Sequence, residues 1–207
     1  MPPKVRIKFP HLYAKQAAFV FCAARYTVIE AATKCGKTVA CLVWLLWMAL
    51  STGAAGRNYW WVAPIFGQTK IAYRRLKRWL APYQGFAKFN DSELTCELPN
   101  GAILWFKSAD HPDGLYGEDV HAAVMDEATR CKEEAWHALR STLTATKGPV
   151  KLIGNVKGRR NFAYQMARKA EAGAPGMAYF RLTAYDAAEA GIYDLAEIED
   201  AKANLPE

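Results

Sequence analysis

The sequence predicts an α/β fold with a mainly parallel sheet and helices on both faces. Three observations support this prediction. Short runs rich in β-branched and aromatic residues alternate with longer apolar or amphipathic stretches along the chain. The tripeptide Gly36-Lys37-Thr38 stands between the first such run and the first long apolar stretch. The acidic pair Asp126-Glu127 directly follows a later run, and ligands bind at such strand ends in open parallel sheets.

Each element is expected from its own pattern. Apolar residues at helical spacing predict helices, and β-rich runs bounded by turn residues predict strands. The pair Asn100-Gly101 between two such runs is typical of a hairpin. In chain order, we expect a strand at 26–31, a helix at 39–50, a strand at 57–64, a helix at 68–80, hairpin strands at 94–98 and 102–106, a strand at 120–125, a helix at 135–143, a strand at 150–154, a helix at 159–172, a strand at 178–183 and a helix at 195–205.

Composition limits the class of protein. Of the 207 residues, 52% are hydrophobic, which excludes global disorder. The net charge of +7 favours a polyanionic partner such as nucleic acid, although an ordinary charged surface would explain it equally well. The five cysteines show no zinc-site spacing, which indicates reduced thiols in a cytosol-like compartment. The first 13 residues lack the apolar segment of a secretory signal, and the run 39–50 is too short to cross a membrane.

The segment around Lys37 has the order of groups that a phosphate loop requires. Backbone N–H groups at a helix N-terminus surround phosphates, the lysine ammonium reaches the β and γ oxygens, and the Thr38 hydroxyl binds Mg²⁺. The first glycine of the usual pattern is replaced by Ala31. A helix N-terminus that merely carries a lysine is the alternative interpretation. The predicted phosphate-binding residues are Thr33, Lys34, Cys35, Gly36, Lys37 and Thr38.

The acidic pair predicts a catalytic metal site. A buried strand rarely ends in adjacent carboxylates unless a positive group binds there. We expect Asp126 to hold Mg²⁺ and Glu127 to orient the attacking water. A solvated strand end is the alternative. Together with the Lys37 loop, the pair predicts a P-loop NTPase of the ASCE or RecA-like type, which hydrolyses its nucleotide.

Asn155 ends the strand expected at 150–154. In this class of ATPase, an extra strand lies between the phosphate-loop strand and the acidic strand. A polar residue at its end can contact the γ-phosphate, so Asn155 is the candidate sensor and the third catalytic residue beside Glu127 and Lys37. An ordinary turn residue before Gly158 is nearly as good an explanation.

The order of these segments resembles the large terminase subunit of bacteriophages, whose N-terminal domain is the ATPase of the DNA-packaging motor. The resemblance implies ATP and Mg²⁺ as cofactors and Gln16 as the amide that pairs with the adenine edge. It also implies an ATPase core at 1–156 and a lid or linker at 157–207. The matching segments are FPHLYAKQ at 9–16, ATKCGKT at 32–38, YWWVAP at 59–64, LPNGA at 98–102, LYG at 115–117, VMDEA at 124–128, LIGNVKG at 152–158 and NF at 161–162.

Two departures from the family pattern matter. Many members carry arginine where this chain has Tyr116, and others carry it in the phosphate loop, where this chain has Thr33 and Lys34. The cation that stabilises the transition state is therefore unassigned, with Lys34, Arg159 and Arg160 as candidates. The family's C-terminal nuclease domain also has no counterpart in these residues, so no nuclease activity is expected from them.

The resemblance further implies double-stranded DNA, a portal protein and a small terminase subunit as partners, a homo-oligomeric ring on the capsid, no membrane, and the host cell cytoplasm as location. Two basic stripes could meet DNA, although either could equally be a plain solvated helix face, and the sequence leaves open which one meets DNA. The alternatives are a helicase-like DNA-stimulated ATPase and a catalytically weak DNA-binding or capsid-assembly module. The stripes consist of Arg74, Arg75, Lys77 and Arg78, and of Arg159, Arg160, Arg168 and Lys169.

Overall fold

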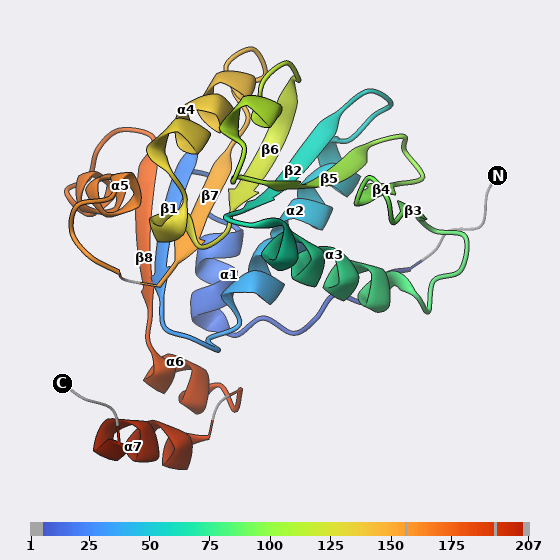
Figure 1. Cartoon of the computed structure of the whole chain (residues 1–207). Helices are drawn as coiled ribbons and strands as arrows, with labels where there is room; N and C mark the ends of the chain where they lie inside the picture. Colours follow the sequence, from blue (N-terminus) through green and yellow to red (C-terminus); the bar gives the residue numbers. More distant parts are fainter. Residues whose placement is uncertain (1–5, 156, 193, 205–207) are drawn as a thin grey trace.

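A single eight-stranded sheet organises the molecule in the computed structural model, which describes residues 6–155, 157–192 and 194–204 (Figure 1). The strand order is β3-β4-β5-β2-β6-β7-β1-β8. All pairings are parallel except those of β4 with β3 and β5. The predicted α/β fold is confirmed. The strands are β1 Tyr26–Ala31, β2 Asn58–Ala63, β3 Lys88–Asn90, β4 Thr95–Glu97, β5 Ile103–Ser108, β6 Val120–Met125, β7 Val150–Gly154 and β8 Met177–Leu182.

Helices cover both faces of this sheet. The buried cluster on one face contains α1, α2 and α3, and the cluster on the other face contains α4 and α5. Along β2, Trp61 packs into the first cluster and Trp60 into the second, as the alternation of a strand buried on both faces requires. The helices are α1 Ala14–Val20, α2 Lys37–Thr52, α3 Phe66–Leu80, α4 Glu133–Thr142, α5 Phe162–Glu171, α6 Ala184–Glu189 and α7 Leu195–Asn204, with short 3₁₀ turns η1 Pro112–Leu115 and η2 Ala128–Arg130.

Most predicted elements are present, with a few differences. The sequence patterns did not predict α1, β3 or α6. The helix expected from residue 159 begins at Phe162, because the side chain of Asn161 accepts a hydrogen bond from the backbone N–H of Tyr164 and so caps the helix. The last helix ends at Asn204 in the described part of the chain, and the expected end at 205 lies outside the described residues.

The order of the strands determines where the functional site lies. β7 lies between β1 and β6 and pairs in parallel with both. The carboxyl ends of these three strands, which carry the phosphate loop, the acidic pair and Asn155, therefore share one edge of the sheet.

The chain beyond residue 156 contributes to the same sheet. β8 pairs with β1 along its whole length, and α5 packs against both strands. By contrast, α6 and α7 lie at one end of the molecule, away from the sheet (Figure 1). The predicted division between residues 156 and 157 stays a prediction, and these contacts attach the first part of the predicted lid to the core.

No helix in the described ranges is both long enough and apolar enough to span a membrane.

Candidate functional site

The loop between β1 and α2 has the backbone conformation of an anion-binding turn. Gly36 is the N-cap residue of α2 and has a φ of 75°, which is unfavourable for any residue with a β-carbon. A β-carbon at this position would also lie 2.4 Å from Nε2 of Gln16. Glycine is therefore required here both by the backbone and by the neighbouring side chain. The N-terminus of α2 faces the loop with its free N–H groups, which is a favourable place for phosphate.

Ala31 does not disturb this loop. The residue is the last of β1, pairs with Leu182 of β8 and is 2% exposed. Its backbone is therefore that of an ordinary strand, which an alanine adopts as easily as a glycine. The phosphate loop of this protein therefore does not need a glycine at position 31.

The side chain of Lys37 joins the phosphate loop to both neighbouring strand ends. Its Nζ lies 2.8 Å from Oδ1 of Asn155 and 3.1 Å from Oε1 of Glu127. The residue is 8% exposed, so its charge is compensated mainly by these two groups. The structure thus brings together three predicted site residues that the chain separates by about 90 to 120 positions.

Asp126 lies deep in the same site. Its Oδ1 accepts a hydrogen bond of 2.9 Å from the backbone N–H of Glu127, and the residue is 9% exposed. Burial, followed by the charge of Glu127, raises the pKa of Asp126 to about 7, although Lys37 and Arg75 act in the opposite direction. A carboxyl group in this environment gains from a nearby cation. Glu127 has a φ of 46°, a left-handed conformation that turns the chain sharply after β6.

Asn155 contacts both of the other strand ends. Its side-chain amide accepts from Lys37 and donates to the hydroxyl of Thr33 at 3.3 Å. Its backbone carbonyl accepts from the hydroxyl of Thr129, in the turn after the acidic pair, at 3.1 Å. Asn155 therefore contacts both the phosphate loop and the turn after the acidic pair, and its role as a sensor stays a prediction.

Gln16 of α1 is buried against the phosphate loop. It is 2% exposed, and its Nε2 donates to the carbonyl of Cys35 at 3.2 Å. Its Oε1 accepts from the backbone N–H of Tyr13 at 3.3 Å, at the start of α1. The Tyr13 hydroxyl also donates to the Cys35 carbonyl at 3.1 Å. Sequence reasoning gave Tyr13 no role, because a tyrosine at the N-cap is not part of the usual Ser/Thr-x-x-Glu/Gln signature.

The segment after β8 also touches the loop. The Cys35 thiol donates to the carbonyl of Thr183 at 3.2 Å, and Lys15 of α1 pairs with Asp186 of α6 at 2.6 Å. Neither contact was predicted, because nothing in the local sequence of a thiol or of an acidic tail indicates its distant partner.

The remaining predicted residues lie at the surface of the molecule. Thr33 is exposed on the loop, Thr38 is half-buried in the first turn of α2, and Tyr116 is exposed. The three candidate cations are also exposed. Among the described residues, none of the three is ion-paired, so the geometry does not single one out as the missing cation. These cations are Lys34, Arg159 and Arg160.

This geometry is consistent with the family that the chain matches. The family model described as "Terminase large subunit, T4likevirus-type, N-terminal" matches residues 28–202. The chain belongs to the large terminase family. It is the N-terminal, ATPase domain of a DNA-packaging terminase subunit, an ATP hydrolase.

Solved structures of other large terminases share the fold of this terminase domain. The ATPase domain of Thermus phage P74-26 large terminase has a TM-score of 0.78 at 20% identity, over 96% of this chain and 89% of that one. The large terminase of another thermophilic bacteriophage, solved in complex with ADP, has a TM-score of 0.77 at 14% identity, over 93% of this chain. Our chain covers 50% of that second chain, so it spans about half of that protein.

A more distant fold match is the helicase domain of Pyrococcus furiosus Hef, with a TM-score of 0.53 at 17% identity, over 83% of this chain and 38% of that one. Identities this low show the fold alone. No curated protein is similar enough in sequence to count as a match.

Proposed function

We propose that this terminase domain binds ATP with Mg²⁺ at the edge where β1, β6 and β7 end, and that hydrolysis there drives double-stranded DNA into a procapsid. The observation that carries the proposal is the position of Lys37 Nζ between Glu127 and Asn155. The ammonium of Lys37 can exchange these two side-chain oxygens for oxygens of the β and γ phosphates. The large terminase of the thermophilic bacteriophage was solved with ADP and with ATP-gamma-S, which supports a nucleotide at the equivalent edge.

The triphosphate is proposed to lie against the N-terminus of α2. There the backbone N–H groups from Cys35 to Thr38 and the Lys37 ammonium receive the β and γ oxygens. When Lys37 turns to the phosphates, it leaves the carboxylate of Glu127. That carboxylate is then free to accept a proton from water.

The donor set fits Mg²⁺. The hydroxyl of Thr38 and the carboxylate of Asp126 are oxygen ligands, the type that this ion prefers, and the buried carboxyl lacks a full counter-charge. When bound, the ion supplies charge neutralisation across the β and γ phosphates. Thr38 and Asp126 would hold the ion, and its positive charge would favour the ionised form of Asp126.

Glu127 is proposed to orient and polarise the attacking water, and Asn155 to report the γ-phosphate. The two Asn155 side-chain bonds, to Lys37 and to Thr33, end on residues that would themselves hold phosphate. Loss of the γ-phosphate would therefore change both bonds at once.

Gln16 is proposed to read the adenine edge. Its amide binds Cys35 and Tyr13 through one N–H and one lone pair, which leaves a second donor and a second acceptor for the base. The segment 157–207 is proposed as the lid. Its link to the loop would be the contacts of Thr183 and Asp186 with Cys35 and Lys15.

The portal protein, the small terminase subunit and a ring of identical subunits are proposed partners, in the host cell cytoplasm. The charge of +7 and the membership of the terminase family support an assembly around DNA.

A phosphate-release assay tests the catalytic part of the proposal. Wild type is expected to show measurable, slow turnover with ATP and Mg²⁺, and Lys37→Ala is expected to abolish it, because the β and γ oxygens lose their cation. Lys88→Ala is the matched control, since it removes an exposed lysine from β3, at the edge of the sheet far from the phosphate loop. Wild-type turnover by Lys37→Ala would overturn the site. Absence of turnover in wild type even with duplex DNA would favour the non-catalytic module.

The likeness to the Hef helicase domain supports one second candidate, a helicase-like DNA-stimulated ATPase. Strand separation and packaging into purified procapsids, both with the full-length subunit, distinguish the two functions. Unwinding of a forked duplex without packaging would favour the helicase.

A further inference from the structure

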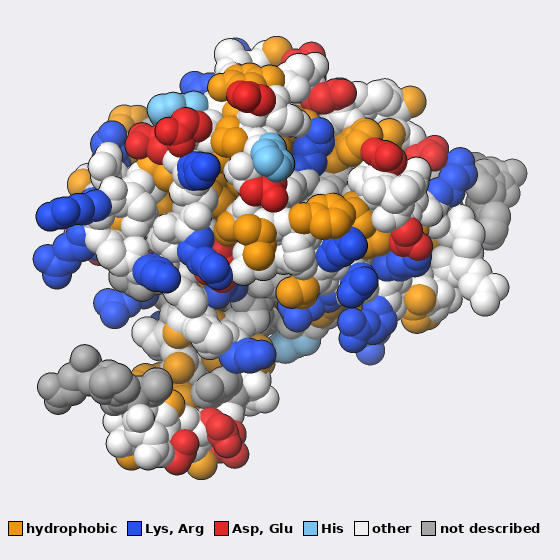
Figure 2. All heavy atoms as spheres, viewed as in Figure 1, with side chains coloured by type: hydrophobic (Ala, Val, Ile, Leu, Met, Phe, Trp, Pro, Cys, Tyr) orange, Lys and Arg blue, Asp and Glu red, His pale blue; other side chains and the backbone are white. Residues whose placement is uncertain are grey.

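The exposed side of α3 is one of the two basic surfaces that the sequence predicts, and most of its cations are not neutralised by acidic side chains of the described residues. The helix carries five Lys or Arg residues and no acidic residue. Ala72, Tyr73, Leu76 and Leu80 face the core, which leaves the opposite side to the basic residues. In Figure 2 a dense group of blue side chains covers the region where α3 lies in Figure 1.

Lys70, Arg74 and Arg78 are spaced by four residues and therefore form one row along the helix. Successive members are about 6 Å apart along the axis. Arg74 and Arg78 are exposed, and neither is ion-paired with any acidic side chain in the described part of the chain. The neighbouring acid, Asp91, is occupied by Lys77 at 2.7 Å and by the hydroxyl of Tyr73 at 2.7 Å.

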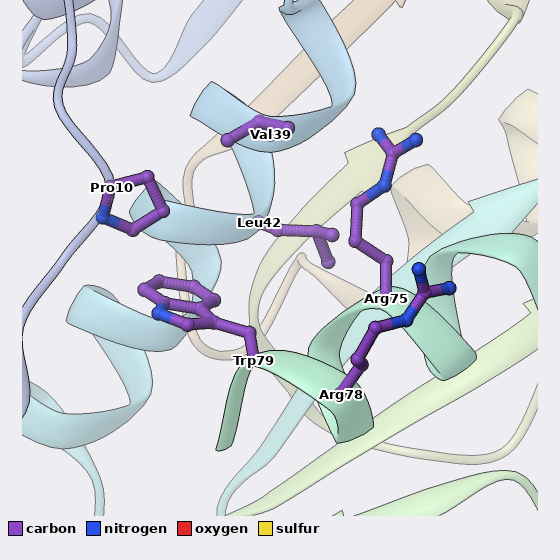
Figure 3. Close-up of a pocket in the computed structure, with 6 residues that line it drawn as sticks. All are labelled: Pro10, Val39, Leu42, Arg75, Arg78 and Trp79. Atoms are coloured by element: carbon purple, nitrogen blue, oxygen red, sulfur yellow. The ribbon is translucent and has the colours of Figure 1, made fainter. Parts of the chain in front are cut away.

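Arg75, beside this row, and Arg78, its last member, lie toward the phosphate-loop helix α2. They line a cavity of about 600 Å³ together with Pro10, Val39, Leu42 and Trp79. Figure 3 shows both side chains projecting from α3, while the Trp79 ring turns toward Pro10. The positive face therefore continues up to the first turns of α2, close to the proposed nucleotide site.

In the second basic stripe, around α5, the charge of Arg168 is neutralised by acidic side chains. Arg168 binds Glu30 at 2.7 Å and Glu171 at 2.5 Å, and its guanidinium also stacks near two tyrosines. Arg159 and Arg160 lie outside α5, in the segment before the N-cap residue. The stripe expected from the sequence is therefore not one continuous row.

We infer that the α3 face, built on Lys70, Arg74, Arg75 and Arg78, is the surface that contacts the phosphate backbone of double-stranded DNA. Duplex DNA carries one negative charge per about 1.7 Å of its axis, so a row of this length faces phosphates in every register. Such a contact reads no sequence, as a translocating motor requires. The inference rests on the proposed function, and it selects α3 from the two basic stripes that the sequence left as candidates for DNA contact.

Binding of a short duplex of random sequence, measured by fluorescence anisotropy without nucleotide, tests the assignment. Arg74→Ala/Arg78→Ala is expected to raise the Kd by roughly ten- to a hundredfold near 0.1 M salt and to reduce the slope of log Kd against log salt by about 2. Arg159→Ala/Arg160→Ala removes the same charge from the other surface and is expected to change the Kd less than about twofold.

A conservative variant separates charge from structure. Arg74→Lys/Arg78→Lys keeps both charges and is expected to restore most of the affinity, because phosphate contacts by a point charge need no forked geometry. Equal binding by wild type and the α3 double variant would overturn the assignment, as would a loss confined to the Arg159/Arg160 variant. If wild type did not bind duplex at low salt, DNA translocation itself would be refuted, whereas the phosphate-release assay judges the ATPase separately.

Discussion

The ammonium group of Lys37 is shared between a carboxylate and an amide that come from two different strands. This arrangement keeps a buried cation satisfied in the absence of phosphate. It also holds the Glu127 carboxylate in an ion pair with Lys37. Under the proposed function, a nucleotide that draws Lys37 away would release Glu127, so a single side chain would link the two events.

Glu127→Gln tests the role of this carboxylate. Because the amide keeps the size of the side chain but cannot accept a proton, phosphate release is expected to fall by at least about a hundredfold. Equilibrium binding of ATP is expected to persist, since Lys37 and the loop are unchanged. Turnover close to that of wild type would show that another group orients the water.

Sequence patterns identified the residue types at the site and not their contacts. Lys37, Asp126 and Glu127 each follow or precede a strand, so local pattern was sufficient to select them. The bond from Lys37 to Asn155 depends on the position of β7 beside β1, which no local pattern contains. The burial that raises the pKa of Asp126 likewise comes from the whole fold.

At the scale of elements, α1 and the phosphate loop behave as one unit. Gln16 and Tyr13 hold the Cys35 carbonyl, and Gln16 fills the space beside Gly36. The helix was not predicted because it is only seven residues long, with no acidic residue in its first turn. Its function as a support for the loop becomes visible only when α1 is packed on α2.

Gly36→Ala tests this unit. An alanine here would have to adopt the left-handed backbone that Gly36 has, at a cost of about 1–2 kcal/mol. Its β-carbon would also push the Gln16 side chain aside. We expect a lower melting temperature and weaker ATP binding, measured by thermal unfolding with and without nucleotide. Gly114→Ala is a suitable control, because its φ is ordinary and its β-carbon would meet open space. Equal effects of the two substitutions would contradict the proposed constraint.

At the scale of the whole molecule, the sheet buries a charged side chain in its interior. Lys151 of β7 is 1% exposed, donates to the carbonyl of Phe19 at 2.6 Å and lies 4.6 Å from the ring centre of Trp44. Burial lowers its pKa to about 8. The sequence predicted this strand correctly, but the partner of its lysine is the end of a helix that the sequence did not predict.

Global stability is expected to depend on pH through Asp126. Its folded pKa of about 7 lies above its ordinary value of 3.8, so the folded state holds the proton more tightly than the unfolded state between these values. Without Mg²⁺, this group therefore stabilises the fold below about pH 4, and that contribution is lost as the pH rises to about 7.

Urea unfolding across this range, compared between wild type and Asp126→Asn, isolates the effect. The variant is expected to lose less stability with rising pH, because its side chain does not ionise. Mg²⁺ is expected to stabilise wild type near pH 8 and to have little effect on the variant. Parallel pH profiles for the two proteins would disprove the raised pKa.

Ala31 lies in regular strand at the position where the usual nucleotide-binding signature demands glycine. A pattern search that insists on that glycine would discard this chain and any other built in the same way. A more tolerant query would require only the Gly-Lys-Thr tripeptide, a preceding strand and a downstream acidic pair. Genome surveys that use it should recover packaging motors that stricter filters overlook.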